Sequence, residues 1–110
     1  MEDFFLEGLK SNIGGNKNKT LIKELKLTFF TWVKFYQDHN LIKKKVVDTL
    51  ENLPEDAVIM KSDLTDDGFE LYKTGVQKWY DAHDRGRSIT DISLLEKYLK
   101  KIRNKKKKNK

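Results

Sequence analysis

The sequence predicts an all-α fold, in which a compact bundle of four to five short helices is followed by a disordered, lysine-rich tail. Apolar residues recur at three- and four-residue spacing in several segments, which is typical of amphipathic helices. Two Thr-Asp pairs stand where helix N-caps are expected, and a run of lysines closes the chain. We therefore expect one helical domain over residues 1–103, with residues 104–110 as the tail.

Three segments of the N-terminal half are predicted to be helical. Residues 2–10 form the first, which ends towards the flexible pair Gly14-Gly15. Residues 20–38 form the second, and apolar residues on several sides mark it as the core element. Residues 41–53 form the third, and Pro54 bars its continuation. The apolar positions of the two longer segments are Ile22, Leu25, Phe29, Trp32, Val33 and Tyr36, then Ile42, Val46, Leu50 and Leu53, while Leu21, Phe30 and Phe35 add apolar bulk beside the main stripe.

A short apolar run at residues 57–60 lies between the third segment and the next one. Four residues do not distinguish an extended connection, a helical turn and a small strand. A short strand therefore stays open as an alternative at this position.

Two capping patterns predict the helices of the C-terminal half. Thr65 is placed to cap a helix whose first turn carries two aspartates, and Gly86 supplies its C-terminal stop. Thr90 followed by Asp91 repeats the pattern for the last helix. That helix is expected to pack through Ile92, Leu95, Leu99 and Ile102.

The charge of the chain is divided between the body and the end. The net charge is +6, but residues 97–110 hold nine Lys or Arg and no acid. Residues 1–96 hold fourteen basic and seventeen acidic side chains, which makes the body mildly acidic at −3. The basic balance therefore belongs to the tail and is weak support for a nucleic-acid-binding face on the body.

Composition excludes several kinds of site. The chain has no cysteine, so a disulfide, a cysteine zinc site and a thiol nucleophile are excluded. His39 and His83 have no partner histidine at helical spacing, and Gly14-Gly15 lacks the rest of a phosphate-binding loop. We predict no catalytic, cofactor or metal site, and hence a protein that is not an enzyme. The acidic start of the chain and the lack of a long apolar run predict a cytoplasmic protein without a membrane span.

Two groups of residues are candidates for binding a protein partner. An acidic patch comprises Asp63, Asp66, Asp67 and Glu70, although aspartates at a helix start also have a structural role there. A surface hot spot comprises Trp79, Tyr80, Asp81, Asp84, Arg85 and Arg87. Tryptophan, tyrosine and arginine are enriched at such hot spots, whereas core packing explains most of the aromatic residues on helical stripes.

A resemblance to known proteins is confined to the region 64–97. It is carried by LTDDGFELYKTGVQKWYDAHDRG at 64–86, by Thr90-Asp91 and by Leu95-Glu96-Lys97. These residues resemble small bacterial helical proteins that include the immunity partners of polymorphic toxins. The resemblance implies a cytoplasmic protein that neutralises an enzyme by covering its active site with complementary charge. The leading hypothesis is a non-enzymatic protein-binding module, either an immunity protein or a similar regulator.

The alternative is a nucleic-acid accessory protein. The tail residues Lys105, Lys106, Lys107, Lys108 and Lys110 would bind phosphates by counterion release, without reading bases. Residues 43–45 form a second basic run that would help. A tail that serves only for solubility is the competing interpretation.

Overall fold

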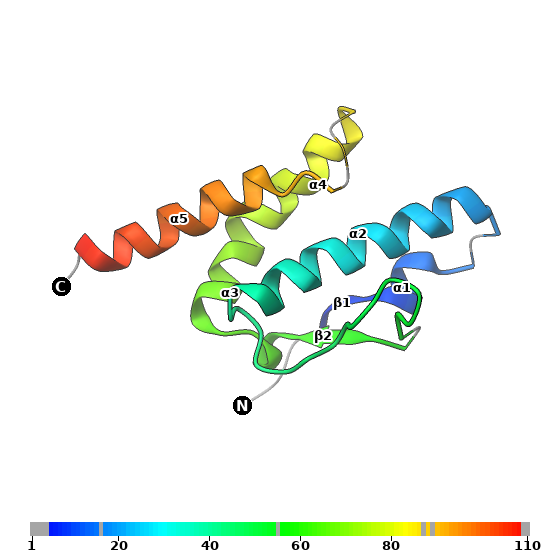
Figure 1. The fold of residues 1–110 in the computed structure, drawn as a ribbon, viewed down its shortest axis with the longest axis horizontal. Helices are drawn as coiled ribbons and strands as arrows, with labels where there is room; N and C mark the ends of the chain where they lie inside the picture. Colours follow the sequence, from blue (N-terminus) through cyan, green and yellow to red (C-terminus); the bar gives the residue numbers. More distant parts are fainter. Residues whose placement is uncertain (1–4, 16, 55, 87, 89, 109–110) are drawn as a thin grey trace.

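The computed structural model describes residues 5–15, 17–54, 56–86, 88 and 90–108. The elements follow the order β1 (Phe5–Gly8), α1 (Leu9–Ile13), α2 (Lys19–Asp38), β2 (Val58–Met60), the 3-10 turn η1 (Lys61–Asp63), α3 (Asp66–Leu71), the π-helical segment η2 (Tyr72–Val76), α4 (Gln77–Asp84) and α5 (Ser93–Lys108). Figure 1 shows α2 across the centre, with the small sheet and α1 on one side and α4 and α5 on the other. The chain is mostly helical, as predicted, but it also contains a two-stranded sheet, so the all-α prediction is incomplete.

The central helix α2 confirms the prediction for residues 20–38. Asn18 caps its start, because the side-chain oxygen accepts a hydrogen bond from the backbone N–H of Leu21 at 3.1 Å. Trp32 is fully buried and lies edge-on to the ring of Tyr36, with 5.2 Å between ring centroids. Aromatic rings in this arrangement add to the stability that burial provides. The core around α2 also contains Leu9, Ile59, Leu71, Val76, Trp79 and Leu95.

The sheet replaces the helix predicted over residues 2–10. β1 pairs antiparallel with β2, with Gly8 opposite Val58 and Phe5 opposite Met60. The backbone N–H of Leu9 continues this pairing by donating to Ala57 O at 3.1 Å. The helix prediction is therefore wrong for the described residues 5–8, because their backbone bonds to a segment far along the chain. The strand left open at residues 57–60 is present.

The segment 41–57 corrects a second prediction, since no helix forms over 41–53. Asn40 adopts a left-handed conformation with φ of 58° and turns the chain away from α2. Ile42 then forms an isolated bridge with Leu64, and the N–H of Lys43 donates to Asp63 O at 2.7 Å. The backbone at the start of this segment is thus bound to residues far along the chain and not to its own next turn.

A side chain of α2 holds the middle of the same segment. Gln37 Oε1 accepts hydrogen bonds from the backbone N–H groups of Val46 at 2.7 Å and Val47 at 2.9 Å. Its Nε2 donates to Val47 O at 2.9 Å. These three bonds satisfy backbone groups that a helix would otherwise have to pair, and Val47 is buried beneath them.

The segments α3, η2 and α4 form one continuous helical stretch. Thr65 caps it as predicted, because its hydroxyl accepts a hydrogen bond from the N–H of Gly68 at 3.1 Å. Within η2, Gly75 lets α5 approach closely, since an added Cβ would lie 3.0 Å from Cβ of Tyr98. Gly86, with φ of 100°, follows the end of α4 and confirms the predicted stop.

The last helix, α5, starts later than its predicted cap. Oδ1 of Asp91 accepts hydrogen bonds from Ser93 N at 3.0 Å and Ser93 Oγ at 2.6 Å, so Asp91 and not Thr90 bonds to the first turn. Leu95 and Leu99 are buried, which confirms that α5 packs through its apolar stripe. The helix continues to Lys108 and thus includes most of the predicted tail; the disorder of residues 104–110 stays a prediction. No helix in the described part of the chain has the length and apolar character needed to cross a membrane.

Candidate partner-binding surface

The acidic patch predicted at residues 63–70 divides into structural and exposed members. Asp63 is structural, because its Oδ2 accepts a hydrogen bond from Met60 N at 2.9 Å and pairs with Lys44 Nζ at 3.0 Å. Only 18% of its side chain is exposed. Asp63 therefore fixes the turn that leads from β2 into α3 and is poorly placed to contact a partner.

The other three acids lie on α3. The side chain of Asp67 is only partly exposed, and its Oδ2 lies 3.9 Å from Nε of Arg103 on α5. Glu70 pairs with Lys73 at 3.3 Å, whereas Asp66 is exposed in the first turn. Asp66 and Glu70 therefore stay accessible at the surface, while Asp67 helps to attach α5 to the body.

Trp79 is not part of the surface. Its side chain is 0% exposed, and its Nε1 donates a hydrogen bond to Asp91 O at 2.8 Å. The prediction that Trp79 contributes to a surface hot spot is wrong, because this ring joins α4 to the start of α5 inside the core. Tyr80 is largely buried beside it, with 5.4 Å between the ring centroids. Burial also raises the pKa of the Tyr80 hydroxyl.

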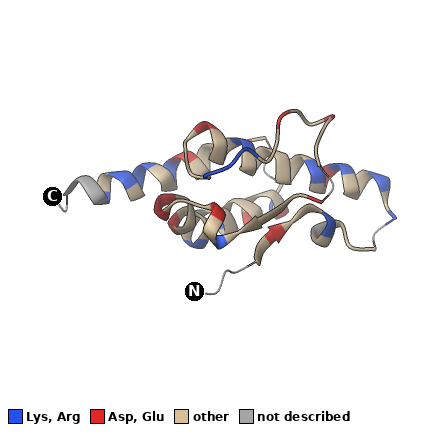
Figure 2. Cartoon of the chain, turned by 90° about the horizontal axis from the view of Figure 1, so that it is seen from below, with Lys and Arg blue, Asp and Glu red and all other residues tan. Residues whose placement is uncertain are grey.

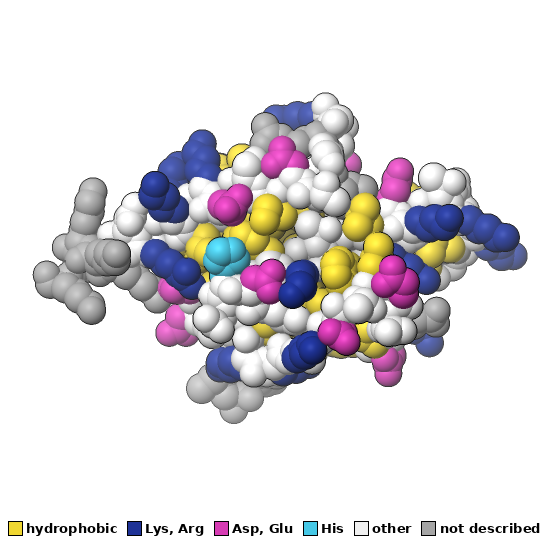
Figure 3. All heavy atoms as spheres, viewed as in Figure 1, with side chains coloured by type: hydrophobic (Ala, Val, Ile, Leu, Met, Phe, Trp, Pro, Cys, Tyr) yellow, Lys and Arg dark blue, Asp and Glu magenta, His cyan; other side chains and the backbone are white. Residues whose placement is uncertain are grey.

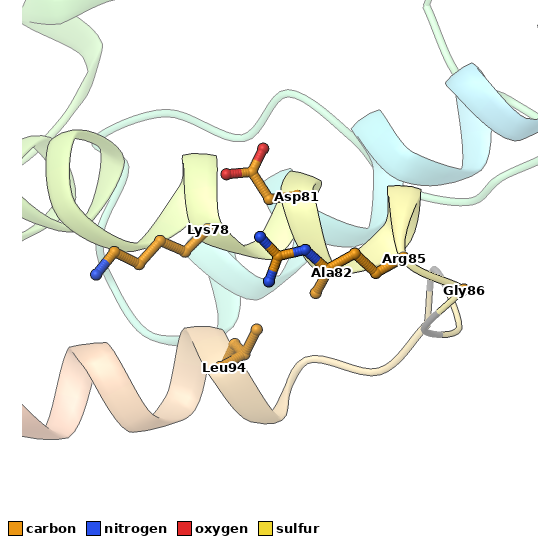
Figure 4. Close-up of a pocket in the computed structure, with 6 residues that line it drawn as sticks. All are labelled: Lys78, Asp81, Ala82, Arg85, Gly86 and Leu94. Carbon is orange, nitrogen blue, oxygen red and sulfur yellow. The ribbon is translucent and has the colours of Figure 1, made fainter.

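The charged members of the predicted hot spot do lie together at the exposed end of α4. Asp81, Asp84 and Arg85 are exposed, while Arg87 lies outside the described residues. A cavity of about 810 Å³ opens between α4 and the first turn of α5, lined by Lys78, Asp81, Ala82, Arg85, Gly86 and Leu94. In Figure 4 the guanidinium of Arg85 folds back along α4 towards Asp81, with Leu94 opposite. Both signs of charge meet in this cavity.

A second hollow, which the sequence prediction missed, lies between α2 and α4. Leu21, Glu24, Leu25 and Thr28 of α2 face Tyr80 and Asp84 around a cavity of about 550 Å³. A smaller cavity of about 230 Å³ continues along α2, between Phe30, Phe35 and Asp38 on the helix and Ile92 opposite. We name this surface the α2 groove: α2 from Leu21 to His39, facing the described residues 80–86, 88 and 90–92. Its sequence signal was the apolar bulk of Leu21, Phe30 and Phe35 beside the main stripe.

The α2 groove has an apolar floor with charged edges. Figure 3 shows apolar side chains gathered along the centre of this face, between α2 and the α4–α5 pair, with acidic and basic side chains around them. Leu21, in the first turn of α2, is 38% exposed and contributes apolar surface to this face. An exposed apolar surface with charged residues around it is typical of a protein-interaction site.

Histidine and tyrosine side chains near the core are held in structural contacts. Burial lowers the pKa of His83, against the upward effects of Asp84 and Asp91, and its ring lies edge-on to Trp79 at 4.2 Å. Burial also raises the pKa of Tyr36, whose hydroxyl donates to Gly68 O at 2.8 Å. Near neutral pH these groups are uncharged, so they stabilise the fold and add no charge to the surface.

Tyr72 ties η2 to the N-terminal strand. Its hydroxyl lies 3.1 Å from Leu6 O and 3.3 Å from Glu7 Oε1. Burial, with the neighbouring Glu7 carboxylate, raises the pKa of Tyr72 to about 12. The phenol therefore stays protonated near neutral pH and donates to these oxygens.

The structure describes only part of the predicted nucleic-acid site. Lys105 is exposed on α5, whereas the side chains of 106–108 and all of residue 110 lie outside the description. In Figure 2 the positions of Lys and Arg recur along the helix that leads to the C-terminus, and also on other parts of the chain. Arg103 is held at the body, because its Nη2 donates to His39 O at 2.8 Å.

Metal ligands do not cluster in the part of the chain that the structure describes: no three His, Asp or Glu side chains are arranged to hold an ion. No family model matches the chain, and neither a curated protein nor a solved structure matches it significantly.

Proposed function

We propose that this protein is a non-enzymatic protein-binding module of the cytoplasm, either a toxin-neutralising immunity protein or a similar regulator. The observation that carries the proposal is the helical stretch from Asp66 to Asp84, which has exposed acids at both ends and a buried inner face. Such a stretch presents negative charge on a fixed frame. A partner with a basic surface, such as an enzyme that acts on an anionic substrate, has the complementary charge.

The rigidity of this stretch supports a binding role. Tyr36 holds its beginning through the bond to Gly68 O, and Trp79 holds its end through the bond to Asp91 O. Because these anchors order the backbone before a partner arrives, association would cost little additional conformational entropy. The acidic body would also speed the encounter with a basic partner at low salt.

A capture experiment with a matched variant tests this proposal. The full chain is immobilised, nuclease-treated native lysate is passed over it, and retained proteins are identified and assayed for inhibition by the chain. We expect one basic protein to be retained and inhibited, and to be lost with the variant Asp66→Asn/Asp81→Asn/Asp84→Asn. Retention of no protein, or of the same proteins by wild type and variant, would contradict the proposal.

A specific observation also favours the alternative function, nonspecific nucleic-acid binding. Figure 1 shows the C-terminal part of α5 projecting past α3, and Arg103 of this helix donates a hydrogen bond to His39 O of the body. A projecting helix rich in lysine can lie along a phosphate backbone without steric obstruction by the body.

Salt dependence tests this alternative. Binding of a fluorescent duplex is measured by anisotropy over a series of salt concentrations, with the full chain and with Lys105→Gln/Lys106→Gln/Lys107→Gln/Lys108→Gln. Each phosphate that the variant no longer neutralises is expected to lower the slope of log K against log salt by about 0.9. A control with the same charge change replaces the exposed residues Lys10, Lys17, Lys19 and Lys23. Equal effects of the two variants would show that only total charge matters.

A further inference from the structure

The α2 groove has a continuous wall. Glu24, Thr28, Thr31, Phe35 and Asp38 follow one another at three- and four-residue spacing, so they share one face of α2. This face joins the cavity beside α4 to the cavity beside Ile92. The hydroxyls of Thr28 and Thr31 donate to carbonyls of their own helix, at 2.7 Å each, and so have no proton left to donate to a ligand. The result is a long, narrow surface with few polar groups on its floor.

The two ends of the groove differ in charge. At one end, the exposed carboxylates of Glu24 and Asp84 stand on opposite walls, and neither has a hydrogen bond or ion pair to a side chain among the described residues. His83 between them is uncharged near neutral pH, because burial lowers its pKa. At the other end, Asp38 is already paired with Lys34 at 2.9 Å. Uncompensated negative charge is therefore confined to the Glu24–Asp84 end.

We propose that the α2 groove is the docking site for a segment of the partner protein that carries a lysine or arginine beside apolar residues. The cationic head enters between Glu24 and Asp84, and its aliphatic stem covers Leu21 and Leu25. Apolar residues of the same segment lie over Phe30 and Ile92. This inference rests on the proposed protein-binding function and specifies the surface and the kind of sequence that it recognises.

The composition of the chain favours a foreign segment over a second copy. The basic run of α5 supplies cations, but it contains no apolar residue after Ile102. It could satisfy Glu24 and Asp84 yet would leave the apolar floor of the groove exposed. A segment that combines both properties removes the apolar surface from water and neutralises the two acids together.

Peptide titration of the isotope-labelled full chain tests the assignment. The groove follows α2 for about 26 Å, which an extended peptide of about eight residues spans. The probe alternates lysine with leucine and phenylalanine, and a counterpart has glutamate for lysine. We expect the lysine peptide to shift backbone amide resonances of residues 21–38 and 80–92, and the glutamate peptide to bind far more weakly.

Matched variants locate the charge effect. Glu24→Gln/Asp84→Asn should weaken binding of the lysine peptide about tenfold, since two exposed charge pairs are removed. Asp48→Asn/Glu51→Gln makes the same change in net charge in the segment 41–57 and should leave the affinity nearly unchanged. Leu21→Ser should weaken binding of the lysine peptide because it removes apolar surface from the groove, and its exposed position keeps the fold intact.

Several results would overturn the inference. These are equal affinity of the lysine peptide for wild type and Glu24→Gln/Asp84→Asn, equal binding of both peptides, no binding of either, or shifts centred on α3. Displacement of the lysine peptide by a peptide of residues 99–110, with self-association of the chain in sedimentation, would assign the groove to a second copy. Such results leave the proposed function to the capture experiment, because retention of a natural partner by the wild-type chain is scored whichever surface the partner uses.

Discussion

The helix α2 and the segment 41–57 carry similar apolar spacing, yet only α2 is a helix. In α2, the apolar residues pack against the ring of Tyr72 and the apolar side chains of α3–α5, and the backbone groups of the helix hydrogen-bond to one another. In 41–57, Leu41, Ile42 and Val47 are buried, but Leu50 is 40% exposed, so the stripe is not used as a unit. The difference shows that apolar spacing is sufficient for a helix only where a whole face is buried.

What replaces the helix in 41–57 is a set of distant backbone partners. The side chain of Gln37 accepts hydrogen bonds from two backbone N–H groups of the segment and donates one to a carbonyl. The backbone carbonyl of Asp63 accepts a hydrogen bond from a further N–H. Because each of these bonds already pairs a backbone group, that group does not need the i to i−4 hydrogen bond of a helix. The contrast between the two regions therefore predicts which substitutions matter in each.

The largest effect is expected in α2. Trp32→Ala should lower the free energy of unfolding by about 3–5 kcal/mol, because it empties a fully buried site. Leu50→Ala, in the other region, should change it by less than about 0.5 kcal/mol. Urea unfolding followed by circular dichroism measures both. Similar losses for the two variants would mean that 41–57 packs as tightly as α2.

The next largest loss of stability is expected where the backbone of Leu41, at the start of 41–57, contacts α3. A Cβ on Gly68 would lie 2.2 Å from Leu41 O, so Gly68→Ala forces these backbones apart. We expect a loss of about 1–3 kcal/mol, although alanine normally favours a helix by about 1 kcal/mol. Gly15→Ala is the control, since nothing lies within 4 Å of its added carbon. A stabilised Gly68→Ala variant in urea unfolding would refute this close contact.

A smaller effect is expected at the link between the two regions. Gln37→Ala removes three hydrogen bonds to the backbone of Val46 and Val47 and should cost about 1–2 kcal/mol. Hydrogen exchange of those two amides should accelerate more than that of amides within α2. Gln77→Ala removes an exposed side-chain hydrogen bond to Asp81 and should be nearly neutral. Unchanged exchange at Val46 and Val47 would argue against this anchor.

The smallest effect is a pH dependence beside α2. Because burial lowers the pKa of folded His83 below its usual 6.5, folding favours the neutral ring. This contribution to stability is fully present above pH 6.5 and is lost as the pH falls through the lowered pKa. His83→Gln should therefore lose less stability than wild type between about pH 7 and about pH 5 in urea unfolding. A variant with the same decline as wild type would exclude His83 as the source.

The parts of the fold that could be predicted from sequence are those determined by local contacts. Thr65 caps α3, and Gly86 stops α4, through groups within a few residues of each other. The N-terminal strand could not be predicted, since β1 acquires its partner only when β2 arrives from residues 58–60. A four-residue segment has too little pattern of its own to reveal such pairing.

Only part of the candidate site could be predicted, because the rest also depends on contacts between distant parts of the chain. Asp81, Asp84 and Arg85 are exposed as expected, but the sequence could not tell whether the adjacent Trp79 and Tyr80 face the solvent or pack in the core, as both do. That choice depends on the helical phase set by η2, whose wider turn has no distinctive residue pattern. The α2 groove was missed because it forms from two helices that approach each other only in the folded chain.

The same segment, η2, constrains how the length of this protein can vary. Each residue of an α-helix advances it by about 100°, so losing one residue from 72–76 would turn Trp79 out of the core and Asp84 away from the α2 groove. Lys73 and Thr74 are exposed and can be exchanged for other residues with little consequence. Among descendants of this sequence, insertions and deletions in this stretch should be far rarer than substitutions.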